Sequence, residues 1–194
     1  MSRSVFTEAG FGVVATMIHD EQSVEALFQQ SLQEAKNLLA RLSVAGGREP
    51  SFSGLTGWVF EKTIQHCIRQ ELELRGLAEK IKEQIPLKGR AKVDLGVGRI
   101  AVEIKTLGLF GQDQVAKCKK YQSEAAERGY RYVFLSRTER TFRTAIMEAL
   151  QPENVVFLDE PSGEWKRFIE IIADDLKRPG CENSLVRHDT PGDN

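Results

Sequence analysis

Two carboxylates and a lysine, Asp94, Glu103 and Lys105, lie in one short segment, residues 92–106 (KVDLGVGRIAVEIKT). The alternation of apolar and polar residues in its second half predicts a β-strand over residues 99–106. Successive side chains of a strand point to opposite faces, so Glu103 and Lys105 share one face while the isoleucines occupy the other. A Glu and a Lys side by side on one face are candidates for chemistry.

The turn before this strand determines how close the two carboxylates lie. Gly98 and Arg99 fit a two-residue hairpin turn with glycine in first position, and counting back from it places Asp94 directly opposite Glu103. Cβ atoms of opposite residues on one face are about 5 Å apart. Two carboxylates at that distance repel each other unless a proton or a cation lies between them. Mg²⁺ fits this position, because it prefers oxygen ligands and often takes only one or two protein carboxylates plus water.

Lys105 would place a positive charge beside the same pair. A divalent cation polarises a phosphate and lowers the pKa of a bound water, while an ammonium group stabilises developing charge or orients the nucleophile. The three residues therefore predict metal-assisted cleavage of a phosphodiester, with Mg²⁺ or Mn²⁺ as the cofactor. The structural alternative is a solvated strand face on which Asp94 takes part in a surface ion pair.

The spacing of apolar residues predicts the elements that must position these groups. Meandering strands come first and α/β alternation follows, which predicts an α/β fold with a mixed β-sheet flanked by helices. We expect helices over residues 21–42, 55–74, 112–128, 140–150 and 163–176, and strands over residues 79–85, 91–97, 99–106, 130–136 and 155–158.

Asp94, followed after a hairpin turn by Glu103-Ile104-Lys105, resembles the signature of the PD-(D/E)XK nuclease superfamily. The order of predicted elements over residues 55–158 is similar to the restriction-endonuclease-like αβββαβ core of that superfamily. One departure from the motif is Val93, which stands where the family has proline before the aspartate. This substitution makes the motif less specific but removes no chemical group from it.

The resemblance implies a role for each residue that matches the motif. Asp94 and Glu103 would bind the metal, the backbone carbonyl of Ile104 would be a further ligand, and Lys105 would be the catalytic lysine. Glu61, on the preceding helix, stands where many members place an additional acidic ligand. From the residues alone, Glu61 is equally well explained as an ordinary helix-surface glutamate.

The resemblance also implies DNA as the substrate. Some members use a glutamine or a basic residue on the helix after the motif, and Gln114 or Lys117 occupies that position, with Tyr121 one turn further along. We therefore expect a divalent-metal-dependent DNA endonuclease in restriction or phage defence. Two alternatives are a structure-selective nuclease of the Holliday-junction type, or a nuclease subunit of a larger complex, and a noncatalytic DNA-binding or assembly module with the same fold.

The distribution of charge is compatible with a polyanionic partner. The formal net charge is −1, but residues 51–150 carry 18 basic and 12 acidic side chains, whereas residues 1–50 and 151–194 are both net acidic. The charged site residues lie in this basic middle segment. The histidines and cysteines lack zinc-ligand spacing, and no apolar run reaches the roughly 20 residues of a membrane span. We expect a cytoplasmic protein with no membrane association.

Three regions are expected along the chain. Residues 1–50 form an N-terminal helical arm and a linker, residues 51–176 the nuclease-like domain, and residues 177–194 a mobile tail. The arm has a long apolar stripe between Val24 and Leu42. We expect this stripe either to pack in the core or to dock a second copy or a partner subunit.

Overall fold

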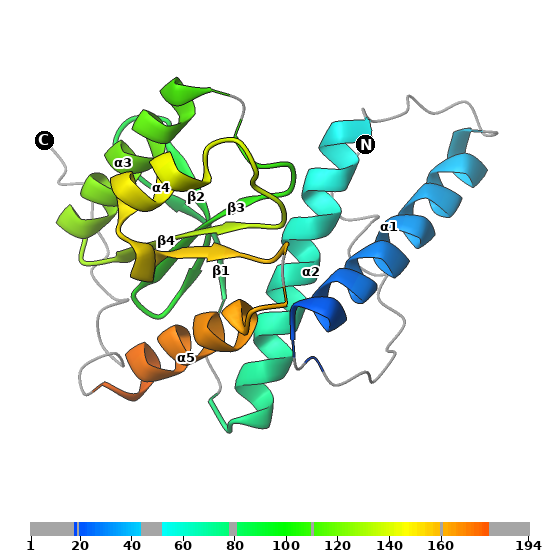
Figure 1. Ribbon diagram of the computed structural model, residues 1–194. Coiled ribbons are helices and arrows are strands. Elements are labelled where there is room, and N and C mark those ends of the chain that lie inside the picture. The colour runs from blue at the N-terminus through cyan, green and yellow to red at the C-terminus, as the bar shows by residue number, and fades with distance from the viewer. Residues whose placement is uncertain are drawn as a thin grey trace, which may run out of the picture.

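The computed structural model describes residues 18, 20–43, 52–77, 81–109, 111–159 and 161–178 (Figure 1). The described residues form five α-helices, one short 3₁₀ turn and five strands. The helices are α1 (Glu21–Ser43), α2 (Phe52–Leu74), α3 (Gln112–Glu127), α4 (Arg143–Leu150) and α5 (Glu164–Lys177), with the 3₁₀ turn at Pro152–Asn154. The strands are β1 (Lys82–Pro86), β2 (Lys92–Val97), β3 (Ile100–Lys105), β4 (Arg131–Ser136) and β5 (Val155–Phe157).

The five strands form one sheet in the order β1-β2-β3-β4-β5. Strand β2 pairs antiparallel with both β1 and β3, whereas β4 pairs parallel with both β3 and β5. Antiparallel neighbours can be joined by short turns, but parallel neighbours need a crossover, which α3 and α4 provide. This arrangement confirms the prediction of an α/β fold with a mixed sheet and flanking helices.

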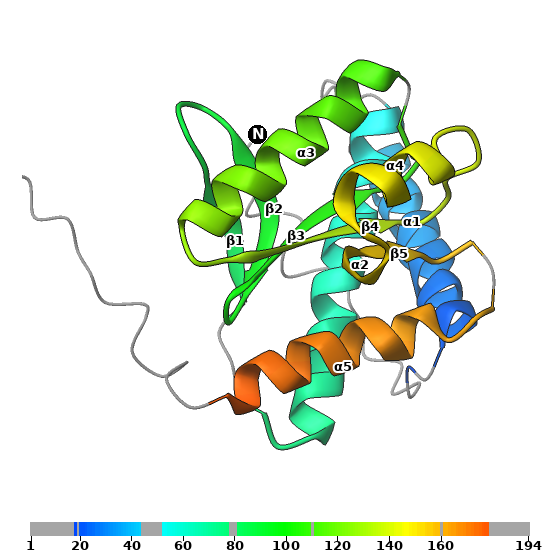
Figure 2. The same ribbon diagram turned by 60° about the vertical axis from the view of Figure 1, so that its left-hand side comes forward.

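Helices cover both faces of the sheet. Figure 2 shows α3 and α4 on one side, with α2 and α5 on the other. Each face has its own apolar cluster, here called the first core (under α2 and α5) and the second core (under α3 and α4). A sheet covered on both faces buries most strand side chains, so a charged residue within it needs a specific partner.

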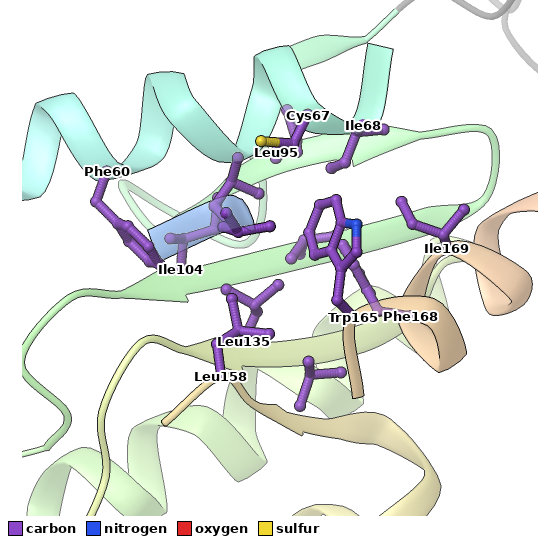
Figure 3. Close-up of a cluster of buried hydrophobic side chains, with 14 of the residues drawn as sticks. Phe60, Cys67, Ile68, Leu95, Ile104, Leu135, Leu158, Trp165, Phe168 and Ile169 are labelled. Atoms are coloured by element: carbon purple, nitrogen blue, oxygen red, sulfur yellow. The ribbon is translucent and has the colours of Figure 1, made fainter. Parts of the chain in front are cut away.

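The first core is the larger cluster and includes the biggest side chains. Figure 3 shows Phe60 of α2 and Trp165 and Ile169 of α5 pointing toward strand residues such as Leu95. Ile104 faces this core, as the alternation in β3 requires, and leaves Glu103 on the second face. The second core contains Ala101 and Phe134 of the sheet together with Val115, Cys118 and Tyr121 of α3.

Helix α1 belongs to the first core. Val24, Phe28 and Leu32 are buried there, and Phe28 packs edge to face on Phe60 with ring centroids 5.2 Å apart. The apolar stripe therefore has a partner within the chain, which supports the packing alternative over docking of a second subunit. The linker between arm and domain, residues 44–51, and the tail from residue 179 onward lie outside the described residues.

Helix and strand boundaries differ from the predictions by more than one residue at three elements, α2, β1 and α4. Helix α2 begins at Phe52 rather than residue 55, and β1 covers Lys82–Pro86 rather than residues 79–85, of which 79 and 80 lie outside the described residues. Helix α4 begins at Arg143 rather than residue 140, because the buried Glu139 carboxylate accepts hydrogen bonds from the amides of Leu109 and Phe142 and holds this segment as a loop. Among the described helices, none is long and apolar enough to cross a membrane.

Candidate active site

The β2–β3 hairpin positions the two carboxylates with the predicted register. Val97 pairs with Ile100, Gly96 with Ala101 and Leu95 with Val102, and the paired ladder ends there, one residue before Asp94 and Glu103. The turn is Gly98-Arg99, and Gly98 has the positive φ of 56° that favours glycine. The predicted hairpin is therefore confirmed.

The end of α5 holds this turn in place. Asp175 accepts a hydrogen bond from the amide of Arg99 at 2.9 Å and forms an ion pair with its guanidinium at 3.2 Å. A Cβ on Gly98 would lie only 2.8 Å from Leu176 Cδ2, so the turn and the helix are closely packed. Contacts from 76 residues further along the chain therefore stabilise the hairpin that carries the site.

Asp94 and Glu103 are a closely spaced carboxylate pair in the sheet. Asp94 Oδ2 accepts a hydrogen bond from the amide of Ile104 at 2.8 Å, which ties the side chain of β2 to the backbone of β3. The Glu103 side chain is buried, with 5% of the residue exposed. Its Oε2 atom has no hydrogen-bond partner among the described residues. A buried carboxylate oxygen without a donor is unfavourable unless a cation or proton compensates it.

The pKa values reflect this crowding. Burial raises the pKa of Asp94, although the charge of Lys105 and the Ile104 amide act in the opposite direction. Burial and then the negative charge of Asp94 raise the pKa of Glu103. The fold therefore makes it unfavourable for both carboxylates to be ionised without a compensating cation.

Lys105 supplies part of that compensation. Its Nζ contacts Glu103 Oε1 at 2.5 Å, and about a third of its side chain (32%) is exposed. Burial alone would lower the pKa of Lys105, but the charges of Glu103 and Asp94 raise it. The lysine is therefore charged and extends from the buried pair toward solvent.

Helix α3 brings a second cation close to the pair. Lys117 is exposed, and its Nζ lies 5.1 Å from the centroid of the Tyr121 ring. Its charge acts on both Asp94 and Glu103 and favours their ionised forms. The structure therefore groups two of the three residues expected to contact DNA, Lys117 and Tyr121. Gln114, the third, is half-buried one turn earlier on the same helix.

Glu61 and Ile104 are the other two metal ligands that the resemblance implied, and each forms a hydrogen bond within the chain. Glu61 lies on α2, against the opposite face of the sheet, where it accepts a hydrogen bond from Gln65 at 3.3 Å. In the described parts of the chain, no three His, Cys, Asp or Glu side chains form a group suited to a metal ion. The role of Glu61 as an additional acidic ligand therefore stays a prediction. The contact observed for Ile104 is made by its amide, to Asp94.

Two further residues border the site and were missed by sequence reasoning. Tyr132 of β4 and Cys118 of α3 are both buried in the second core, and the charge of Glu103 acts on both. Burial raises the pKa of the Cys118 thiol, so it stays protonated and is a poor nucleophile. The alternation in residues 130–136 could have indicated a second polar group on this face, but only with the parallel register of β4 known.

Together these residues form a charged cluster that reaches solvent through Lys105. Two buried carboxylates provide oxygen ligands, and one of their oxygens is unpartnered. Lys105 and Lys117 provide positive charge on the solvent side. Such a group can hold a hard divalent cation and attract a phosphate. No family model, curated protein or solved structure matched the chain.

Proposed function

We propose that this protein is a divalent-metal-dependent nuclease with a restriction-endonuclease-like fold, which hydrolyses phosphodiester bonds in DNA. The observation that carries the proposal is the buried Asp94–Glu103 pair beside Lys105, with Glu103 Oε2 unpartnered. The element order α2-β1-β2-β3-α3-β4, with an antiparallel meander before the parallel crossover, supports it too.

The residues present fit a Mg²⁺ or Mn²⁺ ion. Asp94 and Glu103 would hold it, and two carboxylates are a sufficient protein contribution for Mg²⁺, which keeps several waters and takes further oxygens from substrate phosphates. When bound, the metal would polarise the phosphate and lower the pKa of a bound water. The raised carboxylate pKa values agree with this proposal, since a divalent cation would relieve the repulsion between the two groups.

Lys105 and Lys117 would act on the substrate. The ammonium of Lys105 is fixed against Glu103 yet partly exposed, so it can stabilise negative charge on a phosphate brought to the pair. Lys117 lies on the same side and would contact the DNA backbone, where such contacts confer affinity rather than sequence preference. Lys105 thus acts in the chemical step and Lys117 in binding.

Incubation with a panel of substrates tests the proposal. Supercoiled plasmid, a four-way DNA junction and single-stranded RNA would each be incubated with Mg²⁺, with Mn²⁺ or with EDTA. We expect the plasmid to be nicked or linearised with either metal and to stay intact in EDTA. If only the four-way junction is cleaved, the protein is a structure-selective nuclease rather than a general endonuclease. DNA binding without cleavage in either metal would instead indicate a noncatalytic module.

A further inference from the structure

Tyr132 lies beside Glu103 on the same face of the sheet. In the parallel β3–β4 ladder, Tyr132 pairs with Ala101, and Glu103 follows two residues later, so both side chains point into the second core beneath α3. Only 2% of Tyr132 and 5% of Glu103 is exposed. After burial, the charge of Glu103 is the strongest influence that raises the pKa of the Tyr132 hydroxyl. The phenol and the carboxylate are therefore electrostatic neighbours in a buried space.

Both groups have an unused hydrogen-bonding atom. Tyr132 Oη and Glu103 Oε2 are buried atoms without a hydrogen-bond partner in the described residues. The neighbouring Cys118 thiol interacts with the phenol and affects its pKa, but sulfur is a weak hydrogen-bond partner. Buried phenol groups usually find an acceptor. Glu103 Oε2 is an unpartnered acceptor on the same face of the sheet, and the charge of its carboxylate acts on this phenol.

We propose that Tyr132 is a positioning residue for Glu103, whose hydroxyl donates a hydrogen bond to Oε2 when that carboxylate holds the cation. This inference rests on the proposed function, because it assigns a supporting residue to the same metal site. Each carboxylate oxygen has two lone pairs. Lys105 already occupies Oε1, so Oε2 has one lone pair for the metal and one for the phenol. The hydrogen bond would fix the direction in which Glu103 presents its oxygen.

Mn²⁺ binding measured without nucleic acid tests this role. The unbound Mn²⁺ signal in electron paramagnetic resonance gives the dissociation constant for the wild type and for Tyr132→Phe, Tyr130→Phe and Asp94→Asn. Loss of a partner that orients a metal ligand weakens metal affinity by roughly 10–100-fold, and we expect about tenfold for Tyr132→Phe. Tyr130→Phe is the matched control, since it removes the same atom from a half-buried tyrosine just before β4.

Thermal unfolding in EDTA separates positioning from packing. Because the Tyr132 hydroxyl has no partner in the metal-free protein, Tyr132→Phe should unfold at the same temperature as the wild type or higher. A residue with only a structural role would instead lower that temperature and leave Mn²⁺ affinity unchanged.

The outcomes distinguish failure of this inference from failure of the proposed function. The proposed function and the role of Tyr132 are both supported if the wild type binds Mn²⁺, Asp94→Asn abolishes this binding and Tyr132→Phe weakens it. Tyr130→Phe should bind Mn²⁺ as the wild type does. Equal Mn²⁺ affinity of Tyr132→Phe and wild type overturns the role of Tyr132 alone. If the wild-type protein binds no Mn²⁺, the metal site and the role of Tyr132 are both overturned.

Discussion

Asp94 and Glu103 illustrate how a buried pair of like charges opposes the stability of the fold that contains it. Burial raises the pKa of both, and the negative charge of Asp94 raises that of Glu103 further. An acid whose pKa is raised by folding stabilises the protein below its unfolded pKa, and that contribution is lost as the pH rises through the folded value. The contribution of this pair to the stability of the metal-free protein should therefore decrease as the pH rises from mildly acidic to neutral.

Replacing Asp94 by asparagine should remove part of this effect. Asparagine can still accept the hydrogen bond from the Ile104 amide but cannot repel Glu103. We expect Asp94→Asn to unfold at a higher urea concentration than the wild type at neutral pH in EDTA, and the difference to shrink as the pH falls. Asp174→Asn, at an exposed position of α5, is the control and should change little. A less stable Asp94→Asn protein at neutral pH would show that its neighbours already stabilise the ionised Asp94.

The central site residues could be predicted from the sequence because they depend on local geometry. Strand alternation places Glu103 and Lys105 on one face, and a two-residue turn determines which residue lies opposite. Tyr132 and Cys118 could not be found in this way. They reach Glu103 through the parallel β3–β4 pairing and the packing of α3, which involve residues distant in sequence.

At the scale of elements, the β2–β3 hairpin and the end of α5 form the support of the site. Gly98 combines a left-handed φ with a close approach of Leu176 and Asp175. We therefore expect Gly98→Ala to lower the free energy of unfolding by about 1–3 kcal/mol, measured by urea denaturation.

Gly129→Ala provides the matched control for this glycine. Gly129 also has a positive φ, 78°, but nothing lies within 4 Å of a Cβ built there. Gly129→Ala should lower the free energy of unfolding only by the cost of the left-handed backbone conformation, roughly 1 kcal/mol. If Gly98→Ala and Gly129→Ala lower the free energy of unfolding equally, the contact between α5 and the turn contributes nothing to stability.

Most elements could also be predicted, because their periodicity is strong, but their ends depend on long-range contacts. Helix α4 begins late because Glu139 accepts hydrogen bonds from the amide of Leu109, between β3 and α3, and from the amide of Phe142, just before α4. That carboxylate lies 30 residues from Leu109 in the sequence, and no local pattern indicates the contact. Helix α1 was predicted as an element, but whether its apolar stripe faced a core or a partner could not be decided from periodicity.

At the scale of the whole molecule, α1 and the sheet share one core. Glu25 of α1 forms a two-pronged ion pair with Arg137, both contacts at 2.7 Å, and Glu21 accepts a hydrogen bond from the amide of Trp165 at 2.9 Å. These contacts join α1 to the loop after β4 and to the start of α5. The arm predicted as a separate region is therefore packed against the sequence that follows it.

The distribution of charge over the molecule agrees with the position of the site. The net charge of −1 would not favour binding to a polyanion, but the carboxylate pair lies in the segment with 18 basic and 12 acidic side chains. The positive charges of Lys105 and Lys117 act on that pair. Affinity for nucleic acid should therefore depend on these local charges and decrease as salt concentration rises.

The central claim, that Asp94 and Glu103 hold a cation for phosphodiester hydrolysis, is tested most directly by the Glu103→Gln protein. The rate of supercoiled plasmid cleavage would be measured in Mg²⁺ for the wild type, Glu103→Gln and the control Glu127→Gln, whose side chain is 56% exposed at the end of α3. We expect Glu103→Gln to fold and to cleave more than about 100-fold more slowly, with Glu127→Gln unchanged. Equal Mg²⁺-dependent rates for Glu103→Gln and the wild type would contradict the assignment of the site.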